Sequence, residues 1–255
     1  MERYDFRTKR LFVEVPLAAG RQVEASPGQS NYLFNVLRLK AGDHVLLFNG
    51  ADGEWRAELA PAGRRGCRLT VTDQTRPQSP ASDLWYLFAP LRQARLDYMA
   101  QKAVEMGAGA LLPVITAHTQ VGRLNMARMR ANAIEAAEQC GVLSLPEIGE
   151  PRPLNQVLAG WPAGRHLVFC DETPDAADPL AALKPLRGWP LAVLVGPEGG
   201  FSADERDRLR ALPFVTPVAL GPRILRADTA AVAALALVQA LAGDWRAAPA
   251  RVPDS

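Results

Sequence analysis

The sequence LAVLVGPEGGFS, at Leu191–Ser202, decides how this chain is expected to fold. Its first half is a short continuous apolar run, which is typical of a strand buried on both faces of a parallel sheet. Its second half is a glycine-rich turn that leads into a charged helical segment at 203–212. A turn at the carboxyl end of a parallel strand lets the backbone approach a ligand closely. The stretch therefore predicts an α/β fold with a binding site at this turn.

The second half of the chain shows the same alternation of apolar strands and helical segments elsewhere. Apolar strand-like runs (LWYLFA, ALLPVI, HLVFC and FVTPVAL) alternate with helical patterns at 93–106, 125–140 and 228–241. Such alternation predicts a parallel sheet covered by helices on both faces.

The first part of the chain has a different pattern, with extended segments that do not alternate with helices. Between Leu11 and Asp73 it reads as short extended segments (LFVEV, HVLLFN, EWRAELA and CRLTVTD), interrupted by one helical pattern at 29–37. The segment 75–82 is rich in proline and serine and has no apolar period, which is typical of a boundary. A small β-rich domain is therefore expected to precede the α/β domain.

Composition limits the class of protein. The chain has 255 residues, 48% of them hydrophobic, and a net charge of +2. Its longest apolar stretch near the end is too short for a bilayer, and the start lacks a secretory pattern, so a cytoplasmic protein is expected. Three scattered cysteines and three isolated histidines predict neither a disulfide framework nor a metal site. The positive charge lies toward the front, where residues 1–80 hold 12 basic and 9 acidic side chains.

The turn at Gly196–Ser202 matches neither familiar phosphate-binding motif. It lacks the GxGxxG spacing of a dinucleotide fingerprint and the GK[ST] ending of a P-loop. A plain structural turn is one interpretation of its glycines. Glu198 between them favours another, because a carboxylate at the end of a strand usually caps backbone groups or binds a polar ligand.

A second segment, ALGPRILRADTA at 219–230, follows the last strand and enters the last helix. Asp228 or Thr229 is expected to cap that helix. Arg223 and Arg226 are three residues apart, so one is expected to face solvent while the other points into a pocket; taken singly, each is also compatible with a solvated surface arginine.

Together these two segments resemble the signature of the RsmE-type ribosomal RNA uridine methyltransferases of the SPOUT superfamily. Three further blocks in the same order are similar to that family: NVLRLKAGD at 35–43, QKAVEMGA at 101–108 and EAAEQCG at 135–141. The sequence departs from the family pattern at Val142, at Asp228 with the alanine before it, and at Asn31.

The resemblance implies a PUA-like RNA-binding β-barrel at residues 1–74 and a SPOUT methyltransferase domain with a trefoil knot at residues 75–248. It also implies S-adenosylmethionine as cofactor and a homodimer, whose interface we expect on the last helix. The implied reaction is methylation of N3 of a uridine in 16S ribosomal RNA, within the small ribosomal subunit. Two other functions stay open: a SPOUT enzyme that methylates a ribose 2′-hydroxyl, and a non-catalytic ribosome-assembly factor that binds RNA.

The resemblance also assigns residues. Uridine N3 must lose its proton, and the charge that develops on O2 or O4 must be stabilised. Arg226 is assigned this electrostatic role, and Glu198 either accepts the proton or, as we favour, holds the cofactor's ammonium group. His118, after a strand, is a candidate RNA contact or an ordinary surface histidine. The cofactor is expected to contact Val195, Gly196, Glu198, Gly199, Gly200, Leu220, Gly221, Ile224 and Leu225, and RNA phosphates are expected to contact Arg10, Arg38 and Lys40.

Overall fold

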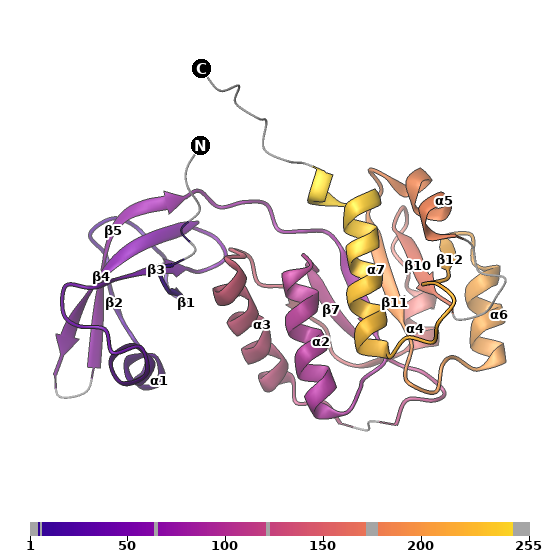
Figure 1. Cartoon of the computed structure of the whole chain (residues 1–255), viewed down its shortest axis with the longest axis horizontal. Helices are drawn as coiled ribbons and strands as arrows, with labels where there is room; N and C mark the ends of the chain where they lie inside the picture. Colours follow the sequence, from indigo (N-terminus) through magenta and orange to yellow (C-terminus); the bar gives the residue numbers. More distant parts are fainter. Residues whose placement is uncertain (1–4, 6, 64–65, 121–122, 172–177, 247–255) are drawn as a thin grey trace, which may run out of the picture. The chain divides into compact units, whose positions relative to one another are not determined.

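The computed structural model describes residue 5 and residues 7–63, 66–120, 123–171 and 178–246 (Figure 1). The chain forms two compact units, one of Met1–Pro80 with Ala137–Leu145 and the other of Ala81–Ala136 with Pro146–Ser255. The division falls inside the proline- and serine-rich segment that the sequence marks. Residues 137–145, which begin in the last turn of a helix, pack with the first unit although they lie far along the chain.

The first unit contains a five-stranded sheet in the order β1-β3-β4-β5-β2. β1 pairs with β3 in parallel and the other neighbours are antiparallel. The predicted β-rich module is therefore present, and the sheet also includes a short strand, β2, that the sequence did not indicate. The strands are β1 Arg10–Phe12, β2 Gln22–Glu24, β3 His44–Phe48, β4 Glu54–Ala62 and β5 Gly66–Arg76.

The core of this unit is made by the inward-facing residues of the strands and by one helical segment. Helix α1, Pro27–Asn31, continues into a π-helical turn, η1, at Tyr32–Val36, so the predicted helix at 29–37 is confirmed. Ser26 and Gln29 form a capping box at its start, which satisfies backbone donors that the helix leaves open. Leu33 packs among the buried side chains of the strands, including Val45, Leu47 and Leu69.

The second unit is built on a parallel sheet, as predicted. The strand order in the sheet is β12-β10-β11-β6-β7-β8, and β9 also pairs with β7. All pairings between the described strands of this unit are parallel. The strands are β6 Trp85–Phe88, β7 Ala110–Ile115, β8 Glu147–Ile148, β9 Arg152–Pro153, β10 His166–Cys170, β11 Leu191–Val195 and β12 Val215–Val218.

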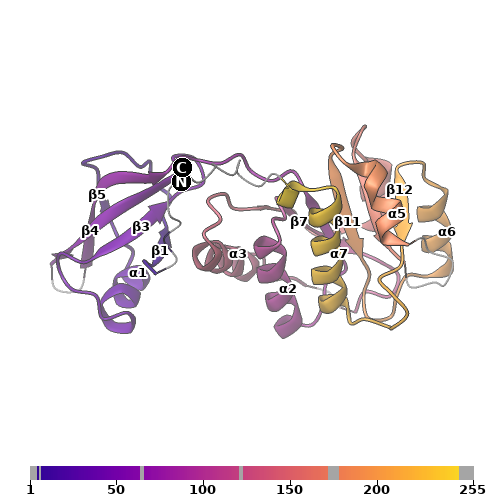
Figure 2. The same ribbon diagram turned by 45° about the horizontal axis from the view of Figure 1, so that its top comes forward.

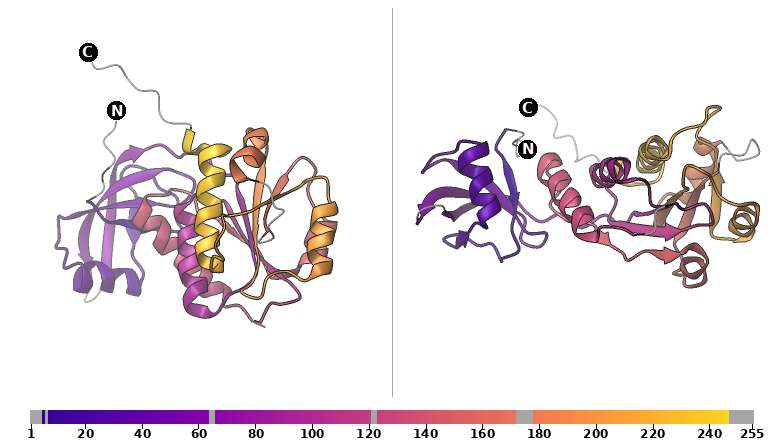
Figure 3. Two further views of the ribbon diagram at one scale, coloured as in Figure 1. Left: turned by 45° about the vertical axis from the view of Figure 1, so that its right-hand side comes forward. Right: turned by 90° about the horizontal axis from the view of Figure 1, so that it is seen from below.

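Helices cover both faces of this sheet, because each central strand presents apolar side chains alternately to either side. Figures 1 and 2 show α2 (Gln93–Glu105) beside α7 (Ala227–Leu241), and Figure 3 shows both on one face with α4 (Leu154–Ala159) on the other. Tyr86 faces α2 and donates a hydrogen bond to Met99 Sδ at 3.0 Å. The remaining helices in the described part of this unit are α3 Met126–Cys140, α5 Pro179–Leu183, α6 Ala203–Ala211 and the short 3₁₀ turns η2 Lys184–Leu186 and η3 Asp244–Arg246.

The predicted cap of the last helix is wrong by two or three positions. Helix α7 begins at Ala227, so its N-cap is Arg226, which makes no side-chain capping bond. Asp228 instead accepts a hydrogen bond from the backbone N–H of Thr229 at 3.1 Å. Arg226 therefore stands at the junction of loop and helix, with its side chain exposed.

No helix in the described part of the chain has the length and apolar character needed to cross a bilayer.

Candidate functional site

The glycine-rich turn leaves the sheet at the end of its most deeply buried strand. All five residues of β11 are buried, and the turn after it runs to Ser202, the N-cap of α6. Ser202 and Glu205 form a capping box there. Within the turn, the N–H of Gly200 donates to the carbonyl of Pro197 at 2.9 Å. The turn is thus held by a backbone hydrogen bond within it and by the capping box at its end.

The second loop connects β12 to α7 and passes close to the first. Its backbone reverses at Gly221, whose φ of +99° is a conformation that other residues rarely adopt. Ile224, three residues later, is 93% exposed.

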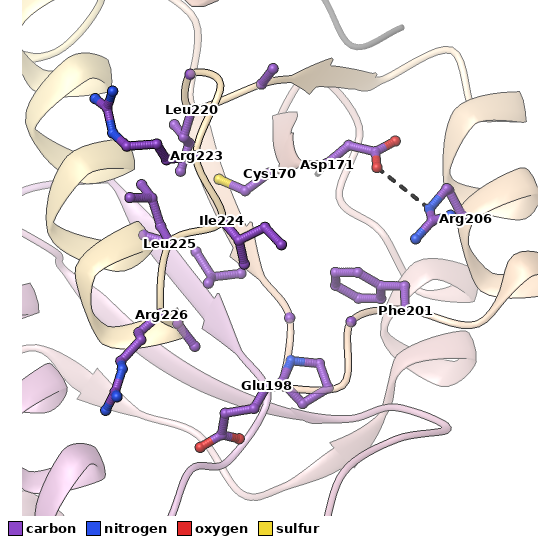
Figure 4. A pocket seen from close by; sticks show the side chains of 18 of the residues that line it. Cys170, Asp171, Glu198, Phe201, Arg206, Leu220, Arg223, Ile224, Leu225 and Arg226 are labelled. Carbon is purple, nitrogen blue, oxygen red and sulfur yellow. Dashed lines mark ion pairs between the residues drawn. The ribbon is translucent and has the colours of Figure 1, made fainter. Parts of the chain in front are cut away.

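Both loops line one pocket of about 650 Å³, shown in Figure 4. The predicted residues that line it are Val195, Gly196, Glu198, Gly200, Leu220, Gly221, Ile224, Leu225 and Arg226. Two segments of sequence about 20 residues apart therefore converge because their strands lie in the same sheet, on either side of β10. The volume lies within the range of small-molecule and cofactor sites.

Gly199 is the predicted cofactor residue that does not line this pocket. A side chain added at Gly199 would meet the Cβ of His118 at 3.3 Å. At Gly196, by contrast, an added Cβ would meet the ring of Phe201 at 2.6 Å, and that ring is part of the pocket wall. Gly196 leaves room for the packing of the wall, whereas Gly199 leaves room for the close approach of a neighbouring loop.

Part of the pocket wall is an ionic cluster around a buried carboxylate, which the sequence did not predict. Asp171, at the end of β10, is 3% exposed and lines the pocket. It pairs with Arg210 at 2.8 Å and with Arg206 at 3.4 Å, both from α6. Cys170 beside it is also in the wall, and burial, followed by the charge of Asp171, raises the pKa of its thiol to about 12. A thiol with this pKa stays protonated at neutral pH and does not act as a nucleophile.

The two predicted catalytic residues, Glu198 and Arg226, are both exposed and lie at one end of the pocket, which we call its mouth. The side chain of Glu198 is 43% exposed and pairs with Arg95 of α2, with Nη1 and Oε1 at 3.2 Å. Figure 4 shows Arg226 at the same end of the pocket as Glu198, while Arg223 extends from the opposite end. The sequence did not predict Arg95, since α2 precedes the turn by about 100 residues.

One of the three predicted RNA contacts does not fit the structure. Arg10 is 6% exposed, and its Nε donates to Glu54 at 2.7 Å inside the first unit. A guanidinium buried in this way has no free face for a phosphate, so its place in the sequence misled the prediction. Arg38 and Lys40 are exposed, and Arg38 has a positive φ of +57° in the tight turn before β3.

Among the described residues there is no group of three or more histidine, cysteine, aspartate or glutamate side chains that could hold a metal ion.

Comparisons with known proteins agree with this geometry. Residues 77–239 match the family model described as an RNA methyltransferase domain, and residues 26–72 match that of an RNA methyltransferase PUA domain. A ribosomal RNA small subunit methyltransferase E from Rickettsia conorii is 30% identical, over 91% of this chain and 95% of its own.

Solved structures give the same result. A ribosomal RNA small subunit methyltransferase E from Neisseria gonorrhoeae, bound to S-adenosyl methionine, superimposes with a TM-score of 0.82 at 27% identity, over 94% of this chain and all of its own. A Legionella pneumophila methyltransferase with bound SAM gives a TM-score of 0.81 at 28% identity, over 92% and 98% of the two chains.

The parallel α/β unit with its two-loop pocket and the preceding PUA domain define an RNA methyltransferase. The chain belongs to the family of the ribosomal RNA small subunit methyltransferases E.

Proposed function

We propose that this protein transfers a methyl group from S-adenosylmethionine to N3 of a uridine in 16S ribosomal RNA. The observation that carries the proposal is the convergence of the two loops on one pocket, with Glu198 and Arg226 at its mouth. The named relatives act on small-subunit ribosomal RNA, and the matching structures from Neisseria and Legionella hold the cofactor.

The pocket fits this cofactor in size and in chemistry. Its volume is about 650 Å³ and its walls include the apolar side chains of Phe201, Leu220 and Leu225, which suit an adenine ring. The carboxylate of Glu198 and backbone groups of the glycine turn offer partners for the charged end of the molecule. When bound, S-adenosylmethionine supplies an electrophilic methyl group.

The remaining chemistry falls to side chains at the mouth. Removing the N3 proton of uridine places negative charge on the flanking carbonyl oxygens, and a guanidinium aimed at one of them lowers the barrier. Arg226 is exposed, lines the pocket and carries a permanent charge, so it has this role in our proposal. In our proposal Glu198 holds the ammonium group through the oxygen that Arg95 does not occupy.

The RNA is proposed to contact both units. Residues 1–74 form the RNA-binding module, in which the exposed Arg38 and Lys40 contact phosphates, and residues 75–248 form the methyltransferase domain. The substrate base must leave its stack, since N3 is hidden in a Watson–Crick pair. We further propose that the loops thread into the trefoil knot implied by the resemblance, that the working form is a homodimer joined through α7, and that it acts on the small ribosomal subunit in the cytoplasm.

Transfer of labelled methyl from S-adenosylmethionine to small ribosomal subunits, followed by nucleoside analysis, tests the proposal. We expect label in 3-methyluridine. Label in a 2′-O-methylated nucleoside would favour the ribose methyltransferase. RNA binding without cofactor binding or methyl transfer would favour a non-catalytic assembly factor.

A further inference from the structure

His118 lies in the loop after β7 and touches the glycine turn instead of projecting freely into solvent. Its Nδ1 is 3.0 Å from the carbonyl oxygen of Gly199 and 3.2 Å from that of Gly200. We propose that His118 is a positioning residue that fixes the orientation of this turn for cofactor binding. The inference rests on the proposed function, since it assigns a role at the same pocket.

The partners determine the protonation of the ring. A carbonyl oxygen only accepts hydrogen bonds, so Nδ1 must carry a proton and donate it to both oxygens. A neutral histidine with its proton on Nδ1 and a charged histidine both satisfy this requirement. The contact therefore does not depend on a second proton at Nε2.

The position of these carbonyls determines where the neighbouring N–H group points. No peptide bond in the described chain is cis, so the Phe201 N–H is antiparallel to the Gly200 carbonyl across one planar peptide. With that carbonyl turned toward His118, the N–H of Phe201 points to the other side of the turn. Gly200 and Phe201 both line the pocket, and within the described residues no group accepts this N–H. We assign it as a donor to the bound cofactor.

Two further contacts hold the histidine loop against the turn. The backbone N–H of Ala117 donates to Glu205 Oε1 at 2.8 Å, and Glu205 is part of the capping box that ends the turn. The Thr119 hydroxyl accepts from the N–H of Thr116 at 2.9 Å and closes the loop on itself. Gly199 leaves room for the close approach, because a side chain there would press on His118. The loop that carries His118 is thus held in place by hydrogen bonds at Ala117 and Thr116.

Three substitutions separate positioning from other roles. In His118→Asn the amide nitrogen occupies the place of Nδ1, in His118→Gln the amide reaches the place of Nε2, and in His118→Ala no donor remains. Binding of S-adenosylmethionine to the full chain, without RNA, is measured by calorimetry. Hydrogen exchange of the peptide that contains the turn is measured in the absence of cofactor. Gln120→Ala is the matched control, since it alters an exposed polar residue of the same loop.

We expect His118→Ala and His118→Gln to weaken cofactor binding about three- to tenfold, the equivalent of one hydrogen bond, and to speed exchange in the turn. His118→Asn and Gln120→Ala should resemble the wild type in both measurements. Normal cofactor binding by His118→Ala, or equal behaviour of the asparagine and glutamine variants, would overturn the inference. If His118→Ala bound cofactor normally but bound RNA more weakly in a separate titration, His118 would instead be an RNA contact. A wild-type protein that fails to bind S-adenosylmethionine would overturn the proposed function itself, and this inference with it.

Discussion

Arginine–carboxylate pairs occur in both units of the molecule, but in very different surroundings. In the first unit, Arg10 and Glu54 pair at 2.7 Å with side chains only 4% and 2% exposed. In the second unit, Arg95 and Glu198 pair at 3.2 Å with side chains 37% and 43% exposed, at the mouth of the pocket. The first pair is enclosed by the unit that it holds together, whereas the second remains accessible to a substrate.

The contrast shows that residue type and local sequence do not reveal what a charge does. Arg10 stands in the basic segment at the front of the chain, which predicted a phosphate contact. Its burial beside Glu54 gives it a structural role, and Arg76 completes the cluster with a second contact to Glu54 at 2.7 Å. Arg95 stands in an unremarkable helical pattern, and only its neighbour across the fold places it at the candidate active site.

Removing the buried carboxylate should have the largest effect. Glu54→Gln leaves two arginines in the cluster without their counter-ion, and breaking a buried pair in this way typically costs about 3–5 kcal/mol. The matched control is Glu24→Gln, because Glu24 pairs with Arg68 at the same 2.7 Å but is 61% exposed. The control should lose less than about 1 kcal/mol. Urea unfolding, followed by a spectroscopic signal from the first unit, measures the free energy of unfolding of both variants. Equal losses would refute the contrast between the buried and the exposed pair.

Arg226→Ala tests the accessible charge at the pocket mouth. Loss of one donor aimed at developing charge typically lowers a rate about 10² to 10³-fold, so single-turnover methyl transfer at saturating RNA and cofactor should fall by this factor. Cofactor affinity should change much less. Arg187→Ala, an exposed arginine outside the pocket lining, serves as control. An unchanged rate would remove Arg226 from catalysis, and a raised apparent KM for RNA beside it would make Arg226 a phosphate contact.

The two glycines of the first loop should differ in their sensitivity. Gly196→Ala places a methyl group 2.6 Å from the Phe201 ring, so the ring must shift and cofactor affinity should fall about tenfold. Gly199→Ala meets the Cβ of His118 at 3.3 Å and requires only a small adjustment, so its effect should be a few-fold at most. Calorimetric titration of both variants with S-adenosylmethionine would contradict this account if Gly199→Ala proved the more damaging.

The cluster of Arg10, Glu54 and Arg76 in the first unit should also make the free energy of unfolding depend on pH. Burial alone would raise the pKa of Glu54, but hydrogen bonds from Arg76, Thr75 and Arg10 outweigh it and lower the pKa below the usual 4.5. A carboxyl with a lowered pKa in the folded state stabilises the fold above its unfolded pKa and loses this effect as pH falls. The difference between wild type and Glu54→Gln in unfolding free energy should therefore be constant near neutral pH and shrink below about pH 4.5. A difference that grew on acidification would exclude this explanation.

The smallest effect is expected for the exposed basic residues of the first unit. Replacing Arg38 and Lys40 together with alanine should weaken RNA binding and reduce the slope of log affinity against log salt by about one per lost phosphate contact. Arg21→Ala alters another exposed arginine of the same unit and should leave the slope unchanged. If the double variant bound RNA with the wild-type affinity and salt slope, the RNA would have to dock elsewhere.

Local sequence patterns predicted the principal strands and helices and the two loops of the pocket, but not short elements such as β2 and α4. Apolar runs such as LAVLV form strands such as β11 in the structure, and the glycine turn after β11 lines the pocket, except at Gly199. The start of α7 was misplaced because Asp228 and Thr229 are good capping residues in isolation, while the observed cap, Arg226, makes no capping bond. Local patterns sufficed wherever the cause of a structure was itself local.

Which charged and polar groups meet depends on how distant elements pack against one another. Arg10 reaches Glu54 across 44 residues, His118 reaches Gly199 across 81, and Arg95 reaches Glu198 across 103. None of these separations follows a helical or strand period, since each contact depends on how two distant elements pack. Burial, which turned Arg10 from a surface charge into part of a core, is likewise a property of the assembled unit, because solvent is excluded by side chains from several strands at once.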